Sequence, residues 1–260
     1  MRRNRPAFLL AVLLWLLLSG CGADTSATPQ HTVTLVAKST QTEFWLSVFA
    51  GAEAAATEYN LQLTIVGPET EEDYESQNTM VAQAVEDGAE ALVFSAIDYE
   101  NNAAAIDAAA RKGVKVVAID SSVDSDQVSI YIGTDNYAAG QMAAQAALDR
   151  VAGELKVGVV NYDISSANGQ ERERGATDVF AQSGRAEINT LAEAEQAEWD
   201  AAAMLQNHPE INVLLAFNEP TSVGAAQAVK ELGLSETVFW WALTPTWLRW
   251  TACRRGPWMR

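Results

Sequence analysis

Short apolar runs alternate with longer amphipathic runs from Thr32 onward. The apolar runs are rich in Val, Ile and Leu and have the length of buried strands, whereas the longer runs repeat apolar residues at helical spacing. Strands that alternate with helices predict parallel βαβ units and an α/β fold. The predicted strands are residues 33–37, 61–66, 91–94, 114–119, 128–132, 157–160, 188–191 and 213–217, and the predicted helices are residues 44–59, 72–86, 102–112, 137–151, 170–182, 199–206 and 222–232.

The pattern restarts near residue 128, which predicts two successive α/β units. We place an N-terminal lobe at residues 32–134 and a C-terminal lobe at residues 135–238, each with a Rossmann-like parallel sheet. Gly88 and Gly113 lie just after predicted helices, where a left-handed cap favours glycine. Because ligands of open α/β sheets bind beyond the carboxyl ends of the strands, two facing lobes would form a ligand cleft.

The start of the chain has the pattern of a targeting segment. Three arginines precede an apolar run over residues 7–18, which is too short to span a bilayer and fits a signal peptide. The Leu-Ser-Gly before Cys21 resembles the bacterial lipobox, in which the cysteine is acylated. We therefore predict a lipoprotein signal peptide at residues 1–20, an extracytoplasmic lipid anchor on Cys21 and a flexible tether at residues 21–31. An ordinary signal peptide with an incidental cysteine is the alternative.

Composition excludes several classes of function. Lys and Arg number 17 and Asp and Glu 34, a net charge of −17, which argues against nucleic acid and against an anionic membrane surface as partners of the body. Two cysteines and two histidines exclude a disulfide framework, a thiolate zinc site and a multi-histidine metal centre. The chain contains no Gly-x-Ser-x-Gly, no phosphate-binding loop and no His-Glu-x-x-His. We expect a binding protein without a cofactor or a metal rather than an enzyme.

Candidate ligand-binding residues of the first lobe follow its predicted strands. Phe44 and Trp45 come after the first strand and are predicted either to stack on the apolar face of a sugar or to pack the start of a helix. Asp120 ends the strand over residues 114–119, where its carboxylate can accept two hydroxyl groups or can cap a turn. Ser95 ends its strand in the same way.

The second lobe contains further candidates. Arg172 and Arg174 lie at the start of a predicted helix, and one of them could point into the cleft, although charged runs are usually solvated. Asn218 ends the strand over residues 213–217 and offers both a donor and an acceptor. Trp199 is predicted to be a second stacking platform or a core residue.

Several motifs resemble those of one family. They are Val-Val-Ala-Ile before Asp120, Tyr-Ile-Gly-Thr-Asp-Asn-Tyr-Ala-Ala-Gly at residues 131–140, Arg-Glu-Arg-Gly at residues 172–175, Asn-His-Pro-Glu-Ile at residues 207–211 and Ala-Phe-Asn-Glu at residues 216–219. Together they resemble the periplasmic sugar-binding proteins of ABC transporters, of the ribose- and galactose-binding type, over roughly residues 32–238.

The resemblance implies a type I periplasmic-binding-protein fold whose two lobes close on one small sugar or polyol, which a membrane permease then collects. It also implies a monomer. Ser95 and Ser121 stand where ribose binders have an asparagine and an arginine. By the family's motifs, the ligand-binding residues would be Ser39, Phe44, Trp45, Ser95, Asp120, Arg174, Trp199 and Asn218.

Three other functions are compatible with such a fold. A sensor that presents a bound sugar to a membrane receptor would share the cleft. A sugar-responsive transcription factor would also share it, but the signal segment and the lack of DNA-binding helices argue against that role. The third alternative is that the chain is a truncated fragment without a function.

The composition changes abruptly after Val238. Residues 239–260 contain five of the eight tryptophans and four arginines but no acidic residue. At this position the family has Val-Val-Gly-Phe-Asp, whereas this chain has Phe-Trp-Trp-Ala. If the codons for Phe-Trp-Trp-Ala are read in a frame that starts one nucleotide earlier, they encode Leu-Val-Gly, which resembles the family motif. We predict a frame slip near Phe239 that leaves the second lobe incomplete and the product poorly folded, with unpaired sheet edges. A Trp- and Arg-rich membrane-interface segment is the alternative.

Overall fold

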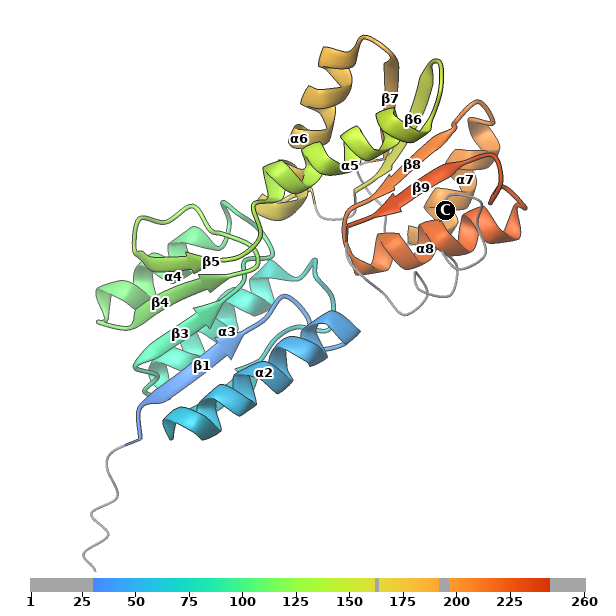
Figure 1. Ribbon diagram of the computed structural model, residues 1–260. Coiled ribbons are helices and arrows are strands. Elements are labelled where there is room, and N and C mark those ends of the chain that lie inside the picture. Colours follow the sequence, from blue (N-terminus) through green and yellow to red (C-terminus); the bar gives the residue numbers. More distant parts are fainter. Residues whose placement is uncertain (1–29, 162–163, 192–196, 244–260) are drawn as a thin grey trace, which may run out of the picture. The chain divides into compact units, whose positions relative to one another are not determined.

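A computed structural model describes residues 30–161, 164–191 and 197–243 of the chain. Two parallel β-sheets with helices on both faces make up this part (Figure 1). The predicted α/β fold with two Rossmann-like sheets is therefore confirmed. The signal peptide, Cys21, most of the tether and the chain after Leu243 lie outside the described residues. Within the described ranges, no helix has both the length and the apolar composition that crossing a membrane requires.

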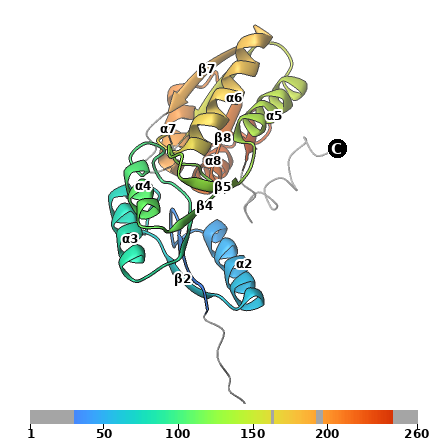
Figure 2. The same cartoon turned by 90° about the vertical axis from the view of Figure 1, so that its left-hand side faces the viewer.

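The first sheet has the strand order β2-β1-β3-β4-β5 and is parallel throughout. Its apolar side chains alternate between two faces, as the strand geometry requires. Leu92 and Phe94 pack under α3 and α4, whereas Leu35 packs under α2 on the opposite face (Figures 1 and 2). The elements are β1 (Thr32–Val36), α2 (Glu43–Tyr59), β2 (Gln62–Val66), α3 (Tyr74–Glu86), β3 (Ala91–Phe94), α4 (Ala103–Arg111), β4 (Lys115–Ile119) and β5 (Val128–Ile132).

The second sheet has the order β7-β6-β8-β9 and is also parallel. Helices α5 and α6 cover the face that contains Val157 and Val159, and α7 and α8 cover the face that contains Val160 and Leu214. The elements are α5 (Asn136–Arg150), β6 (Leu155–Val160), α6 (Ala167–Ser183), β7 (Ala186–Leu191), α7 (Ala197–Asn207), β8 (Val213–Ala216), α8 (Glu219–Glu231) and β9 (Phe239–Ala242).

Helices α5 and α6 cross at two glycines. A Cβ atom on Gly140 would overlap the backbone carbonyl of Arg172, and one on Gly175 would overlap the carbonyl of Tyr137. Only glycine allows the two backbones to approach this closely. The crossing therefore fixes the start of α6, which faces the carboxyl ends of the second sheet's strands.

Local capping explains where several helices begin and end. The side chains of Thr42, Asp73, Asp135, Ser166 and Asn218 accept hydrogen bonds from backbone N–H groups in the first turns of α2, α3, α5, α6 and α8. Gly88 and Gly113 follow α3 and α4 with φ values of +84° and +91°. The predicted left-handed positions are therefore confirmed.

The structure departs from the sequence expectation after Val238. Phe239–Ala242 form β9 and pair with β8 in a regular parallel register, although we expected residues from 239 onward to lie outside the fold. Phe and Trp have high strand propensity. Phe239 and Trp241 pack against the core under α5 and α6, while Trp240 packs on the other face. The alternation therefore suits a strand despite the unusual composition.

Candidate ligand-binding site

The candidate side chains gather where the parallel strands end. We call Ser39, Ser95 and Asp120, which follow β1, β3 and β4, the first rim. The second rim consists of Asn161 and Asn218, which follow β6 and β8, and of Arg172 from α6. Carboxyl ends of parallel strands meet at one edge of a sheet, where ligands of α/β proteins bind.

Asp120 has an unusual backbone conformation. Its φ is +57°, in the left-handed region that a non-glycine residue rarely adopts. Its N–H donates to the Ile132 carbonyl (3.0 Å), and the Tyr131 hydroxyl donates to the Asp120 carbonyl (2.6 Å). Burial, followed by the nearby charge of Asp120, raises the pKa of Tyr131 above its ordinary value. These contacts stabilise a conformation that costs on the order of 1–2 kcal/mol.

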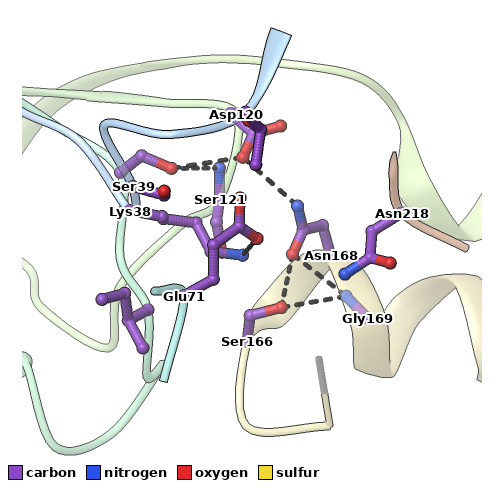
Figure 3. Close-up of polar contacts among 12 residues, drawn as sticks. Lys38, Ser39, Glu71, Asp120, Ser121, Ser166, Asn168, Gly169 and Asn218 are labelled. Atoms are coloured by element: carbon purple, nitrogen blue, oxygen red, sulfur yellow. Dashed lines mark hydrogen bonds and ion pairs between the residues drawn. The ribbon is translucent and has the colours of Figure 1, made fainter. Parts of the chain in front are cut away.

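The half-buried carboxylate of Asp120 is oriented by two neutral donors. The Ser95 hydroxyl donates to its Oδ2 atom (3.2 Å). The Asn168 amide donates to the same atom (3.3 Å; Figure 3). The Ser121 N–H in turn donates to Ser95 Oγ (3.3 Å). Within the described residues, the buried Ser121 hydroxyl has no hydrogen-bond partner. Ser95, which we predicted to line the ligand, thus contacts Asp120 directly.

Ser39 closes the loop after β1. It is buried, its hydroxyl donates to the Glu69 carbonyl (2.8 Å), and it accepts the Gln41 N–H (3.0 Å). Next to it, the buried Lys38 forms an ion pair with Glu71 (3.5 Å; Figure 3). The first lobe therefore uses Ser39 to fix the loop backbone.

Trp45 is a core residue, so the prediction that it stacks on a ligand is wrong. It is fully buried with Leu35 and Ala37, and its indole N–H donates to Glu71 Oε1 (2.8 Å). The first turn of α2 lies over the sheet, so the large ring fills the space between them. Phe44 meets Trp45 edge to face at 5.2 Å and stays 37% exposed, so it alone of the pair presents an accessible ring.

Asn218 combines a capping role with an unused donor. Its Oδ1 atom accepts the Thr221 N–H (3.1 Å) and hydroxyl (2.7 Å) at the start of α8. Its side-chain amide nitrogen is buried, and among the described residues it has no hydrogen-bond partner. The acceptor is thus structural, and the donor remains available to a ligand.

The structure favours Arg172 over Arg174 as the arginine of the second rim. The half-buried Arg172 donates from Nε to Asn136 Oδ1 (2.9 Å) and from Nη1 to the Phe217 carbonyl, directly before Asn218. Arg174 is exposed, and its guanidinium lies 5.0 Å from the centre of the Tyr137 ring. We therefore propose Arg172 in place of the predicted Arg174, because two residues along a helix rotate a side chain away from the strand ends.

Trp199, the remaining candidate, belongs to α7, but its side chain lies outside the described part of the chain. The described residues also contain no group of three or more His, Cys, Asp or Glu side chains that could hold a metal ion.

Comparison with known proteins places this geometry in a family. A family model described as a periplasmic binding protein domain matches residues 33–252, which include β9. The chain belongs to this family.

Two curated members and one solved structure illustrate the likeness. Over 231 residues the chain is 26% identical to the D-allose-binding periplasmic protein of Escherichia coli, covering 83% of this chain and 73% of that protein. Over 236 residues it is 29% identical to the D-ribose/D-allose-binding protein of Pseudomonas aeruginosa, covering 86% and 73%. The crystal structure of a sugar transporter from Clostridium phytofermentans is 28% identical, with a TM-score of 0.76 over 82% of this chain and 80% of that one.

Sequence reasoning missed Asn168 and Asn161 and did not choose Arg172. Asn168 and Arg172 are separated by four positions, so they lie on one face of α6, and this spacing was a usable signal. Asn161 directly follows β6 as Asp120 follows β4, and its amide donates to Glu173 Oε2 (2.7 Å) and to the Gly169 carbonyl (3.3 Å). A search for every polar residue at a strand end would have found it.

Proposed function

We propose that this binding protein captures a small sugar or polyol for an ABC importer and passes it to the membrane permease. The observation that carries the proposal is the polar chemistry of the two rims. Asp120 presents a half-buried carboxylate, and Asn218 presents a buried amide without a partner among the described residues. An unsatisfied buried donor costs about 1–3 kcal/mol, which a ligand hydroxyl would offset.

These groups suit a neutral ligand that carries several hydroxyl groups. A carboxylate accepts two hydroxyl donors, while the Asn218 amide and the Arg172 guanidinium donate to hydroxyl oxygens. The exposed ring of Phe44 can cover the apolar face of a sugar ring. The names of the D-allose- and D-ribose/D-allose-binding relatives support this ligand class. The function is binding, and no catalytic step is part of it.

Isothermal titration of the full chain with D-ribose, D-allose and xylitol tests the proposal. We expect at least one of them to bind. Asp120→Ala should weaken that binding about 100-fold, because it removes charge-assisted hydrogen bonds that contribute about 1.5–3 kcal/mol each, and about 1.4 kcal/mol is a tenfold change.

Asp124→Ala is the matched control, since Asp124 is an exposed acid of the same loop and lies outside both rims. It should bind like the wild type. A wild-type chain that binds none of the three ligands, or an Asp120→Ala variant that binds as tightly as the wild type, would contradict the proposal.

We also propose that an acylated Cys21 anchors the protein outside the cytoplasmic membrane. The lipobox-like Leu-Ser-Gly-Cys supports this proposal. Mass spectrometry of the protein from the membrane fraction should find an acylated N-terminal cysteine, and Cys21→Ser should move the protein to the soluble extracytoplasmic fraction. Membrane association that is unaffected by Cys21→Ser would rule the anchor out.

A further inference from the structure

Gln77 is a fully buried polar residue outside both rims. It projects from α3, and its amide nitrogen donates to the Ala37 carbonyl and to the Ser95 carbonyl, both at 2.8 Å. Its Oε1 atom accepts the Ile97 N–H at 3.1 Å. One side chain therefore fastens the ends of two neighbouring strands, β1 and β3, with three hydrogen bonds.

These bonds hold the backbone around Ser95. The Ser95 carbonyl and the Ile97 N–H are bound to Gln77, and the Ser95 N–H donates to the Val36 carbonyl (3.2 Å). The backbone at Ser95 is thus fixed on both sides. The position of a serine Oγ atom is set by the backbone and by a single side-chain torsion, χ1. With its backbone fixed, Ser95 Oγ can therefore occupy only the few positions that the χ1 rotamers allow.

Ser95 then connects this framework to the ligand-binding carboxylate. Its hydroxyl donates to Asp120 Oδ2 (3.2 Å) and accepts the N–H of Ser121 (3.3 Å), so it holds both sides of the Asp120–Ser121 peptide. Asp120 needs such support, because its φ of +57° is strained for a non-glycine residue. Strained residues persist at functional sites only where the surroundings over-determine them.

We propose that Gln77 is a positioning residue that acts through Ser95 to aim the Asp120 carboxylate at the ligand. The proposal rests on the proposed function, because Gln77 can change the ligand affinity only if the Asp120 carboxylate binds the ligand. Side chains that support the ligands of a metal ion change metal affinity by about 10- to 100-fold when they are removed, and we expect an effect at the lower end of that range here. A buried amide that only stabilises the fold would change the melting temperature and leave the affinity unchanged.

The test compares two variants of α3 in the full chain. Gln77→Met removes the amide but keeps a similar length, and Val81→Ala removes a buried apolar contact of the same helix. Titration with D-ribose and D-allose should show about tenfold weaker binding for Gln77→Met. Val81→Ala should lower the melting temperature and change the affinity less than about twofold. Equal affinity of Gln77→Met and wild type would overturn the proposal.

A double-mutant cycle tests the route through Ser95. If Gln77 acts through Ser95, Gln77→Met should weaken binding less than about twofold when Ser95→Ala is already present, so the two effects are not additive. Full additivity would overturn the proposal. If Gln77→Met does not fold, Gln77→Glu, which keeps an acceptor for the Ile97 N–H, takes its place under the same criteria.

A ligand-free measurement separates this inference from the proposed function. The ¹³C chemical shift of the Asp120 carboxyl carbon should change in Gln77→Met and Ser95→Ala and stay constant in Val81→Ala. If the wild-type chain binds none of the sugars, the proposed function fails, and this shift still decides the role of Gln77. A carboxyl shift that is the same in wild type and Gln77→Met would overturn it.

Discussion

The two rims use their polar side chains in different ways. In the first rim, Ser39 bonds the Glu69 carbonyl and Ser95 bonds Asp120, so most polar atoms are engaged within the lobe. In the second rim, Asn218 uses its oxygen to cap α8 and leaves its amide nitrogen buried without a partner among the described residues. Arg172 binds only neutral groups in the described part, a side-chain amide and a backbone carbonyl.

This difference indicates that the two rims have different roles in ligand binding. The first rim is organised before a ligand arrives, because a buried network holds its one carboxylate in place. The second rim retains one buried donor, the Asn218 amide nitrogen, whose desolvation is not compensated by a partner among the described residues. This donor gains most when a ligand supplies an acceptor. Affinity would then depend on both rims, whereas stability would depend mainly on the contacts of the first. Variants that separate stability from affinity test this view.

The largest expected effect is on stability and comes from Trp45 beside the first rim. Trp45→Ala removes a fully buried ring and should cost about 3–5 kcal/mol, or about 10 °C in melting temperature. Phe44→Ala, its partly exposed neighbour, should cost less than about 2 kcal/mol. Thermal unfolding followed by circular dichroism measures both. If Trp45→Ala lowers sugar affinity without lowering the melting temperature, Trp45 contacts the ligand and the comparison fails.

The second expected effect is on affinity and comes from the arginines of α6. Arg172→Ala should weaken sugar binding on the order of 30-fold, because a charged donor to the ligand contributes about 1.5–3 kcal/mol. Arg174→Ala removes the same charge from the same helix and should change the affinity less than about twofold, because Arg174 lies over Tyr137. Titration calorimetry of both variants decides the point. A larger loss in Arg174→Ala would restore the assignment that the sequence motif favoured.

The fold could be predicted because hydrophobic spacing determines it. Apolar side chains alternate between the two covered faces of each sheet, and this pattern is visible without coordinates. Two helix starts were each predicted three residues too late. Helix α6 begins at Ala167, earlier than predicted, because Ser166 caps it ahead of the poor helix former Gly169. Helix α8 begins at Glu219 because proline is tolerated in a first turn.

The site was only partly predictable. Residues within two positions of a strand end, such as Asp120 and Asn218, were found, since strand ends are recognisable in the sequence. Whether an aromatic ring points into the core or out of it depends on the position of the helix over the sheet, so Trp45 and Phe44 could not be distinguished. The direction of Arg172 depends on where α6 starts, and that start was placed too late. Strand β9 was missed because the unusual Trp and Arg content after Val238 was given more weight than the alternation of side chains between the two faces of a strand.

The smallest effect separates the two functions of Asn218 itself. Asn218→Ser keeps an oxygen that can cap α8 but removes the amide donor. Serine and asparagine are comparable N-caps, so the free energy of unfolding should change by less than about 0.5 kcal/mol, while sugar affinity should fall about tenfold. Asn218→Ala removes the cap as well and should lose about 1 kcal/mol of stability together with the affinity. Urea unfolding and titration calorimetry of the pair measure the two quantities. If Asn218→Ser binds sugar as tightly as the wild type, the buried amide does not contact the ligand, and the second rim would owe its affinity to Arg172 and Asn161.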